Sequence, residues 1–257
     1  MTILYFTATG NSLYVAKKLG GQLLSIPQLV KAKVDEIEDD AVGVVCPVYC
    51  GELPRMVREF LLKAKIGTNY FFFVFTYGMN ETTARFHAGA LCDEIGLRLD
   101  YADAVLMVDN YLPGFEMREQ MDSVAQKDIE GQLARITDHI RQRKKQTVTV
   151  SPLKKAEMAL IHRAMGKRIL TPDAAKHYIV TDACVRCGVC ERVCPADNVK
   201  VTDKVTIGSR CEVCFACVHN CPQGAIHLKN EKSAVRFRNE NVSLSEISDS
   251  NGRSYQT

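Results

Sequence analysis

The C-terminal part of the chain is organised by two cysteine runs, Cys184-x-x-Cys187-x-x-Cys190-x-x-x-Cys194-Pro195 and Cys211-x-x-Cys214-x-x-Cys217-x-x-x-Cys221-Pro222. Three thiolates two residues apart wrap one face of a cubane iron–sulfur cluster only if the chain curls tightly around it. The fourth thiolate, held beside a proline, cannot reach back and is expected to serve the other cluster. The spacing therefore predicts two [4Fe–4S] clusters, one on Cys184, Cys187, Cys190 and Cys221 and the other on Cys211, Cys214, Cys217 and Cys194.

Zinc and disulfides are the alternatives to this interpretation. Zinc sites usually pair C-x-x-C units across wider gaps and do not need three closely spaced cysteines followed by Cys-Pro. A disulfide framework implies an oxidising compartment, and the sequence shows no secretory signal. The crossed ligand pattern would also replace the hydrophobic core that a segment of about 50 residues could hardly build.

These runs resemble the bacterial two-cluster ferredoxins over roughly residues 177–230. Gly188, and Gln223-Gly224-Ala225-Ile226 after Cys221-Pro222, also agree with that family. Many free ferredoxins are acidic, whereas basic and acidic residues nearly balance here. This departure favours a tethered relay over a diffusing carrier.

Length and composition set further limits. The chain has 257 residues, an apolar share of 46% and a net charge of +3, which is too small to argue for nucleic acid by itself. Eleven cysteines without a signal peptide indicate a reducing compartment. No run approaches the roughly 18 apolar residues of a membrane span. We therefore expect a cytoplasmic protein with no membrane span.

The N-terminus combines a short apolar run, Ile3–Phe6, with a loop of small hydroxyl residues that opens a helical pattern. The loop consists of Thr7, Ala8, Thr9, Gly10, Asn11 and Ser12. Backbone N–H groups and the helix dipole favour an anion there, and the absence of Lys and Arg favours a monophosphate. The loop matches neither the nucleotide-hydrolase nor the dinucleotide glycine motif. An ordinary Ser/Thr-rich helix cap is the alternative.

Apolar and helical patterns then alternate up to residue 143. Continuous apolar runs at 41–46, 70–75 and 105–108 are typical of buried parallel strands, and helical spacing covers 53–64, 81–95 and 121–143. Such alternation predicts an α/β fold with a parallel sheet. A ligand in such a sheet lies at the carboxyl ends of the strands.

Two more loops leave strands at that edge. One contains Pro47, Val48, Tyr49, Cys50 and Gly51, and the other contains Thr76, Tyr77, Gly78, Met79 and Asn80. Each offers an aromatic residue on which a flat ring can stack, and a glycine that lets the backbone approach the ring. At either loop alone, a simple turn is the alternative.

Together the three loops resemble the flavodoxin family over roughly residues 1–145. The resemblance implies a doubly wound parallel sheet and FMN, with its phosphate in the first loop and its ring between the other two. Ser12 replaces the threonine of many flavodoxins, and the region from Asp109 to Met117 lacks a long acidic loop. The implied cofactor residues are Thr7, Ala8, Thr9, Gly10, Asn11, Ser12, Pro47, Val48, Tyr49, Gly51, Thr76, Tyr77 and Gly78.

The sequence thus predicts a flavodoxin-like α/β domain over 1–145 and a smaller α+β ferredoxin-like domain over 177–232. A basic helical connector is expected over 146–176, with Ser151-Pro152 at its start, and a mobile C-terminal tail over 233–257. The basic face of the connector is interpreted as solvated, because no aromatic residues are interleaved with its charges. Of the remaining cysteines, Cys46 has no assigned role, Cys92 is expected to be buried, and Cys50 is a candidate for contact with the flavin.

A flavin carries two electrons and each cluster carries one, so the combination predicts a converter between two-electron and one-electron transfer. The fused order resembles the EFR-type flavodoxin–ferredoxin fusion proteins of anaerobes. That resemblance implies electron transfer with redox partner proteins, and nucleic acid is not expected as a partner. A flavin-dependent reductase of quinone or O₂, and a cluster-based regulatory module, are the alternatives. Flavin and clusters could meet within one chain or across a homodimer.

Overall fold

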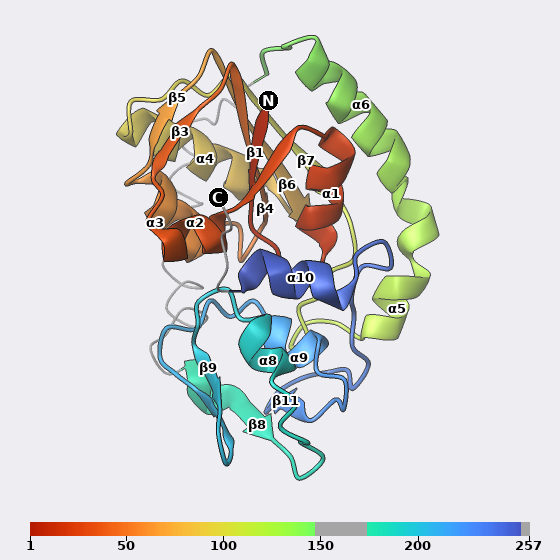
Figure 1. Cartoon of the computed structure of the whole chain (residues 1–257). Coiled ribbons are helices and arrows are strands. Elements are labelled where there is room, and N and C mark those ends of the chain that lie inside the picture. Colours follow the sequence, from red (N-terminus) through yellow and green to blue (C-terminus); the bar gives the residue numbers. More distant parts are fainter. Residues whose placement is uncertain (147–173, 253–257) are drawn as a thin grey trace.

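A five-stranded parallel sheet forms the centre of the N-terminal half (Figure 1). The computed structural model describes residues 1–146 and 174–252. The strands are β1 (Thr2–Tyr5), β2 (Gln22–Ser25), β4 (Ala41–Pro47), β6 (Tyr70–Tyr77) and β7 (Tyr101–Leu106), in the spatial order β2-β1-β4-β6-β7. Counted along the chain this is the order 2-1-3-4-5, one of the two common doubly wound arrangements. The predicted α/β class with a parallel sheet is confirmed.

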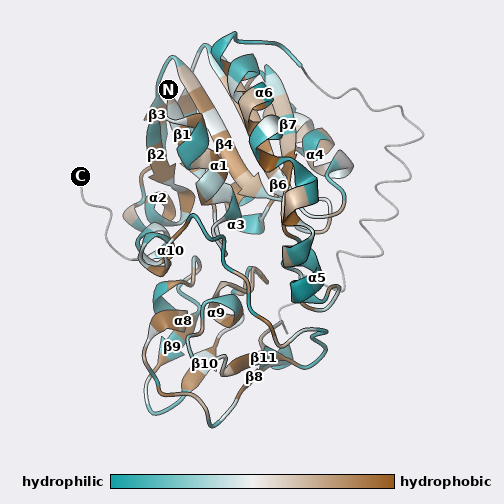
Figure 2. Ribbon diagram, turned by 90° about the vertical axis from the view of Figure 1, so that its right-hand side faces the viewer, coloured by the Kyte–Doolittle hydropathy of each residue, from teal (hydrophilic) through white to brown (hydrophobic). Residues whose placement is uncertain are grey.

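The sheet is buried on both faces, as its continuous apolar runs predict. Phe71, Phe72, Phe73 and Phe75 of β6 are each at most 1% exposed, and Figure 2 shows the hydrophobic strands enclosed between helices. The helices are α1 (Asn11–Leu19), α2 (Ile26–Ala32), α3 (Arg55–Leu61), α4 (Thr82–Glu94) and α6 (Ile129–Arg141). Helix α1 packs beside α6, and α2 beside α3. Each buried phenylalanine contributes roughly 2–3 kcal/mol as an upper estimate.

Some element boundaries differ from the prediction. The single helix expected over 121–143 is divided into α5 (Met117–Asp122), a 3-10 turn η1 (Val124–Lys127) and α6. The break occurs at Asp128, whose backbone is left-handed with φ of 44° and whose side chain caps α6 by accepting from the Gly131 amide at 3.3 Å. The predictions also missed β2, α2 and a small parallel pair of β3 (Glu36–Glu38) and β5 (Lys65–Gly67), all too short for a clear period.

Residues 174–232, here called the cysteine unit, contain two antiparallel strand pairs and two short helices. Strand β8 (Tyr178–Val180) pairs with β11 (Ile226–Leu228), and β9 (Val199–Val201) pairs with β10 (Val205–Ile207). A 3-10 turn η2 (Ala174–His177) precedes β8, and α8 (Val189–Arg192) and α9 (Ala216–His219) lie within the two cysteine runs. Each run therefore contains a loop and a helical turn, and a strand follows each run.

The prediction of a mobile C-terminal tail is wrong for residues 233–252, which are here called the strap. The strap crosses between the two units and ends in α10 (Leu244–Asn251), which lies between them (Figure 1). Ser243 and Glu246 form a capping box, and Ile247 is fully buried. The polar composition of the segment hides the few apolar residues that anchor it.

The expected connector helix beginning at Ser151 lies outside the described residues. No helix in the described part of the chain combines the length and the apolar character required to cross a membrane.

Candidate functional site

The two cysteine runs wind identically although their sequences differ. In each run the second and fourth residues after the first cysteine have left-handed backbone: Arg186 and Gly188 in the first run, and Val213 and Phe215 in the second, with φ between 52° and 77°. Such a conformation costs roughly 1–2 kcal/mol at a non-glycine residue, so surrounding structure must hold it. These positions curl each chain segment so that its cysteines face inward.

The first cysteine cavity is lined by Cys184, Cys187, Cys190 and Cys221. The last of these belongs to the other run, so the cavity collects the cysteines in the crossed manner of the predicted ligand set. One edge faces solvent, since Cys187 is exposed and the neighbouring Val185 is 62% exposed.

The second cysteine cavity is lined by Cys194, Cys211, Cys214 and Cys217, again in the crossed combination. It is better covered, because Cys194, Cys214 and Cys217 are all buried. Tyr178 and Phe215 also line it. Its side chains come from both runs, so the cavity joins the two halves of the cysteine unit.

Hydrogen-bond donors surround the cysteine sulfurs. The amides of Asn198, Val213 and Ala225 donate to the sulfurs of Cys194, Cys211 and Cys221, each at 3.3 Å. The hydroxyl of Tyr178 lies 3.4 Å from Cys211 Sγ. Donors of this kind stabilise thiolates and tune the potential of a cluster held by them.

Burial is the main electrostatic effect on these thiols. It raises the pKa of Cys190 to about 11 and raises the pKa of Cys214 and Cys217 well above the ordinary value. Binding to iron would therefore displace their protons. No three His, Cys, Asp or Glu side chains within residues 1–146 and 174–252 are arranged to hold a single metal ion. Ligands of a cubane bind different irons and need not converge on one point.

A third cavity, here called the strand-end cavity, lies at the carboxyl ends of β1, β4, β6 and β7. Most of the predicted cofactor residues line it: Thr7, Ala8, Thr9, Asn11, Ser12, Pro47, Val48, Tyr49, Thr76, Tyr77 and Gly78. The sheet topology therefore brings the three predicted loops together, although they are far apart in sequence.

Two predicted residues, Gly10 and Gly51, do not line the strand-end cavity. A Cβ on Gly51 would lie 2.1 Å from Thr83 Oγ1, so this glycine serves the packing of its turn against α4. Cys50, the candidate for flavin contact, is exposed and also lies outside the lining. Cys92 is 1% exposed within α4, as expected.

The prediction missed Val108, Asp109 and Asn110, which line the same cavity. They follow the strand expected over 105–108, and the carboxyl ends of parallel strands share one edge. That rule could have found them. Burial raises the pKa of the Asp109 carboxyl, partly offset by a hydrogen bond from the Tyr111 amide at 3.0 Å.

The phosphate end of the strand-end cavity fits a monophosphate. The amides of Ala8, Thr9 and Ser12 make no hydrogen bond to any described residue. The hydroxyl oxygen of Thr7 accepts from the Gly10 amide at 3.2 Å, and that of Thr9 accepts from Asn110 Nδ2 at 2.6 Å. Both hydroxyl hydrogens thus stay available for donation. The lining contains no Lys or Arg, so uncharged donors would hold the anion.

At the other end, Tyr49 and Tyr77 provide aromatic surfaces. Tyr49 packs edge-on against Phe6, with ring centroids 6.3 Å apart. A Cβ on Gly78 would lie 2.1 Å from Asp109 Cβ, so only glycine allows the two loops to approach this closely. The residues present therefore fit a flat ring joined to a phosphate, as FMN is.

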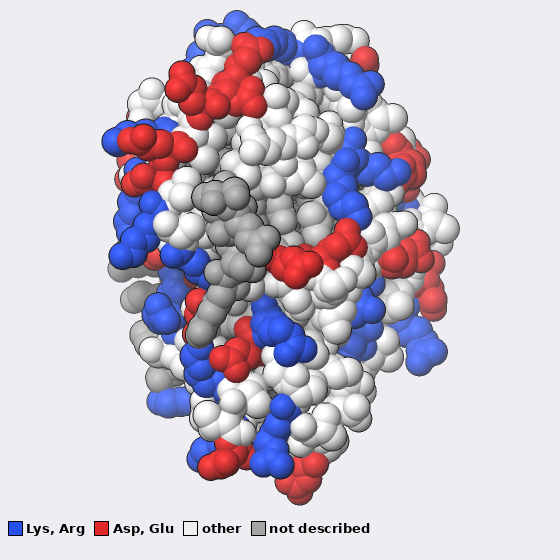
Figure 3. All heavy atoms as spheres, in the orientation of Figure 1, with Lys and Arg blue, Asp and Glu red and all other residues white. Residues whose placement is uncertain are grey.

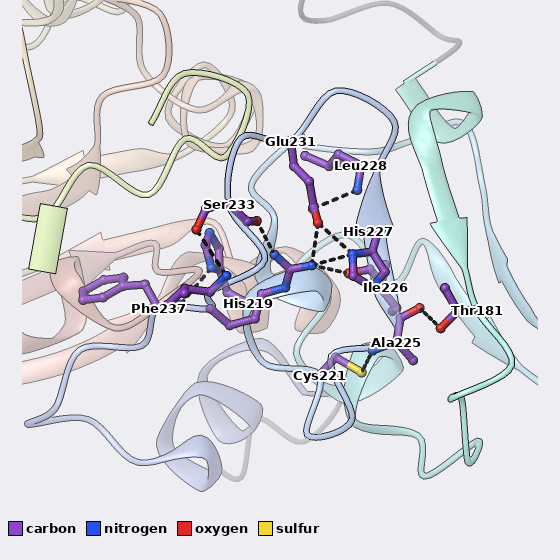
Figure 4. Close-up of polar contacts among 12 residues, drawn as sticks. Thr181, His219, Cys221, Ala225, Ile226, His227, Leu228, Glu231, Ser233 and Phe237 are labelled. Atoms are coloured by element: carbon purple, nitrogen blue, oxygen red, sulfur yellow. Dashed lines mark hydrogen bonds and ion pairs between the residues drawn. The ribbon is translucent and has the colours of Figure 1, made fainter. Parts of the chain in front are cut away.

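Helix α9 joins the second cysteine cavity to the strand-end cavity. Cys217 on α9 lines the former. His219 Nε2 lies 2.9 Å from the Asn110 carbonyl, and Asn220 Nδ2 donates to the Ala8 carbonyl at 3.1 Å. Burial lowers the pKa of His219 to about 4, so the ring is neutral, with Nδ1 accepting from the Phe237 amide at 3.1 Å (Figure 4).

An ion pair and an aromatic contact join the same two regions. Arg55 at the start of α3 binds the buried carboxylate of Glu212 at 2.8 Å, and Glu212 lies between Cys211 and Cys214. The rings of Tyr111 and Phe215 lie 5.9 Å apart. Sequence alone gave no signal for Glu212, His219 or Asn220, because each acts through a residue distant in the chain.

Comparison with known proteins supports the iron–sulfur assignment. Residues 177–200 match a family model described as a 4Fe-4S binding domain. The matched segment contains the first cysteine run, and the second run lies beyond it. The match indicates a [4Fe–4S] cluster in this chain and an electron-transfer role in general.

Two curated relatives are called "Ferredoxin-type protein NapG", from Escherichia coli (strain K12) and from Shigella flexneri. Each is 34% identical over 77 residues, which cover 25% of this chain and 33% of the relative. The chain thus spans about a third of the length of the curated relatives it matches.

Among solved structures, a putative flavoprotein from Bacteroides uniformis ATCC 8492 aligns at 13% identity with a TM-score of 0.33. The alignment covers 47% of this chain and 95% of that one. A similarity of this extent does not by itself establish a shared fold.

Proposed function

We propose that this chain is an electron-transfer protein that holds FMN in the strand-end cavity and one [4Fe–4S] cluster in each cysteine cavity. When bound, FMN would supply a store of two electrons and each cluster a store of one, so one reduced flavin matches two clusters. The doubly wound strand order, which flavodoxins share, supports the flavin assignment.

The observation that carries the proposal is the position of α9. Helix α9 contains Cys217, which lines the second cysteine cavity. His219 on the same helix and Asn220 directly after it are hydrogen-bonded to loops of the strand-end cavity. Cofactors in the two cavities would be separated by little more than packed side chains of one protein. This arrangement favours transfer within a single chain over transfer across a homodimer.

The residues of the chain would perform three tasks. The neutral donors of the first loop would hold the flavin phosphate, and Tyr49 and Tyr77 would cover the ring. The amide and hydroxyl donors around the sulfurs would set the potential of each cluster.

Anaerobic purification followed by measurement of iron, sulfide and FMN tests this function. We expect about eight irons and one FMN per chain, since each cubane contains four irons. Photoreduction of the flavin should then reduce the clusters, as followed by EPR. Protein that contains all three groups but passes no electrons from flavin to clusters would contradict the proposal.

One observation favours a flavin-dependent reductase as a second candidate. Asp109 places a half-buried carboxyl with a raised pKa in the strand-end cavity, where it could donate a proton to a reduced small molecule. Turnover of a quinone by the purified protein, lost in Asp109→Asn with FMN still bound, would support this candidate. Absence of turnover with quinone and O₂ would leave electron transfer between proteins as the function.

A further inference from the structure

The outer side of the first loop is held by three asparagines from the C-terminal part of the chain. Three successive loop carbonyls each accept one hydrogen bond. The side-chain Nδ2 of Asn251 donates to the Thr7 carbonyl at 3.1 Å and that of Asn220 donates to the Ala8 carbonyl at 3.1 Å. The backbone N–H of Asn239 donates to the Thr9 carbonyl at 2.8 Å. The asparagines are only 1%, 3% and 8% exposed, respectively. Bonds buried to this degree fix the positions of the peptide groups that they contact.

These bonds also determine where the loop amides point. In a trans peptide the carbonyl and the N–H of the next residue point in opposite directions. With the Thr7 and Ala8 carbonyls held toward the asparagines, the Ala8 and Thr9 amides are directed away from them. Those amides have no acceptor among the described residues, and both residues line the strand-end cavity.

The strap closes the outer side of the loop completely at Gly10. This residue has φ of +100°, and a Cβ there would lie 3.0 Å from Cβ of both Asn239 and Val242. Asn239 Nδ2 also donates to Asn11 Oδ1 at 3.1 Å. The strap itself is fastened to the cysteine unit, where Arg236 binds Glu231 at 3.0 Å (Figure 4).

Two of the asparagines connect the loop directly to the cysteine runs. Asn220 lies between Cys217 and Cys221, and its amide group also donates to the Ala216 carbonyl at 2.9 Å. Asn251 donates a second bond to the carbonyl of Val193, the residue before Cys194, at 3.1 Å. Each amide therefore bridges the first loop and a segment that bears cluster ligands.

We propose that Asn220, Asn239 and Asn251 are positioning residues for the phosphate of FMN, and that cluster assembly and phosphate binding are thermodynamically coupled through them. This inference rests on the proposed function. Because metal binding is coupled to folding, bound clusters would stabilise the wound conformation of the cysteine runs. Loss of the clusters would free Asn220 and Val193 to move. The loop amides would then no longer be held in one orientation. By linkage, bound FMN stabilises the clusters in return.

The test compares FMN with riboflavin, which lacks the phosphate. Asn220→Ala and Asn251→Ala should each raise the Kd for FMN about tenfold, the effect of one buried hydrogen bond. The Kd for riboflavin should change by less than about twofold, because riboflavin does not use the loop. Iron content is measured in each variant to show that the clusters are assembled. Asn241→Ala, on the same strap, is the matched control, because Asn241 is exposed and its described hydrogen bonds use only its backbone.

Equal weakening of both ligands in the asparagine variants would overturn the proposal, as would unchanged affinities. A second measurement needs no variant: FMN should slow the loss of iron from the wild-type protein to a chelator several-fold more than riboflavin does. Equal rates with the two ligands would also overturn the coupling. If the wild-type protein binds no FMN, the proposed function itself fails. If it binds FMN and the variants bind it equally well, only the positioning role fails.

Discussion

At the scale of single residues, the cysteine sulfurs are distinguished by their donors. Within the described residues, the Tyr178 hydroxyl is the only side-chain group that hydrogen-bonds a cysteine sulfur. The other donors to sulfur are backbone amides. Burial and the neighbouring thiols raise the pKa of its phenol well above the ordinary value, so the phenol stays protonated. A protonated phenol beside a thiolate acts as donor and favours the reduced, more negative cluster.

Tyr178→Phe is therefore expected to lower the midpoint potential of the cluster in the second cysteine cavity. The expected shift is roughly 20–60 mV, the effect of one hydrogen bond on a one-electron couple. An EPR-monitored redox titration measures it. Tyr111→Phe is the matched control, because the Tyr111 hydroxyl bonds no cysteine sulfur in the described part of the chain. An unchanged potential in Tyr178→Phe would rule out the phenol as a tuning group.

Gly78 and Gly89 differ in the space available for a side chain: Gly78 is tightly packed and Gly89 is not. Gly78→Ala places a methyl group 2.1 Å from Asp109 Cβ and must separate the loops of the strand-end cavity. We expect it to weaken FMN binding at least tenfold, as measured by fluorescence titration. Gly89→Ala in α4 meets no atom within 4 Å and should stabilise the protein by about 0.5–1 kcal/mol. Normal FMN affinity in Gly78→Ala would show that the loops can separate without loss.

At the scale of elements, a buried carboxylate joins β7 to two helices. Asp103 is 3% exposed and binds Arg135 of α6 at 2.6 Å and Arg85 of α4 at 3.3 Å. It also accepts from the Tyr101 hydroxyl at 2.7 Å. The burial of Asp103 raises its pKa, but these partners outweigh burial and the net shift is downward. The carboxylate therefore remains charged in the fold.

Asp103→Asn should destabilise the protein by about 2–3 kcal/mol. The loss is less than that for a fully buried pair, because the Arg135 side chain is 46% exposed. Urea unfolding followed by circular dichroism measures it. Asp138→Asn on α6 is the control, since within residues 1–146 and 174–252 the Asp138 side chain bonds only Gln142, the residue that follows α6, and its loss should change stability little. Equal losses of stability in the two variants would show that Asp103 does not stabilise the fold by joining β7 to α4 and α6.

Sequence patterns predicted long buried elements well and short or polar ones poorly. Strands β4 and β6 follow from their continuous apolar runs. Helix α6 was expected as part of a longer helix, because nothing in a helical pattern reveals that Asp128 adopts a left-handed backbone. Helix α10 was missed since its stability depends on being packed between two other units, and its own composition is polar.

At the scale of the whole molecule, the two cysteine cavities occupy different positions. The second cavity faces the α/β unit, through α9 and through the Arg55–Glu212 ion pair. The first cavity has the solvent-exposed edge at Val185 and Cys187. Positive and negative side chains are interspersed over the face shown in Figure 3. A relay from flavin to the second cavity, then to the first cavity and a partner protein, fits this arrangement.

Removing one cluster at a time tests the order of the relay. In Cys187→Ala, photoreduced flavin should still reduce the remaining cluster of the second cavity. In Cys214→Ala, the remaining cluster of the first cavity should stay oxidised, or be reduced at least tenfold more slowly, since rates fall with distance. Chemical reduction with dithionite and EPR show that this cluster is assembled. Equal rates in the two variants would contradict the proposed order.

The sequence by itself determined the cysteine spacing, the crossed ligand prediction and the alternation of strands and helices. These are local properties, because the curl of the backbone and the spacing of apolar residues depend on residues that are close together in the sequence. The tertiary structure alone decided that Asn220, Asn239 and Asn251 hold the first loop and that α9 joins two cavities. Such contacts join residues up to 244 positions apart, and their partners are fixed only when the sheet, the cysteine unit and the strap pack together.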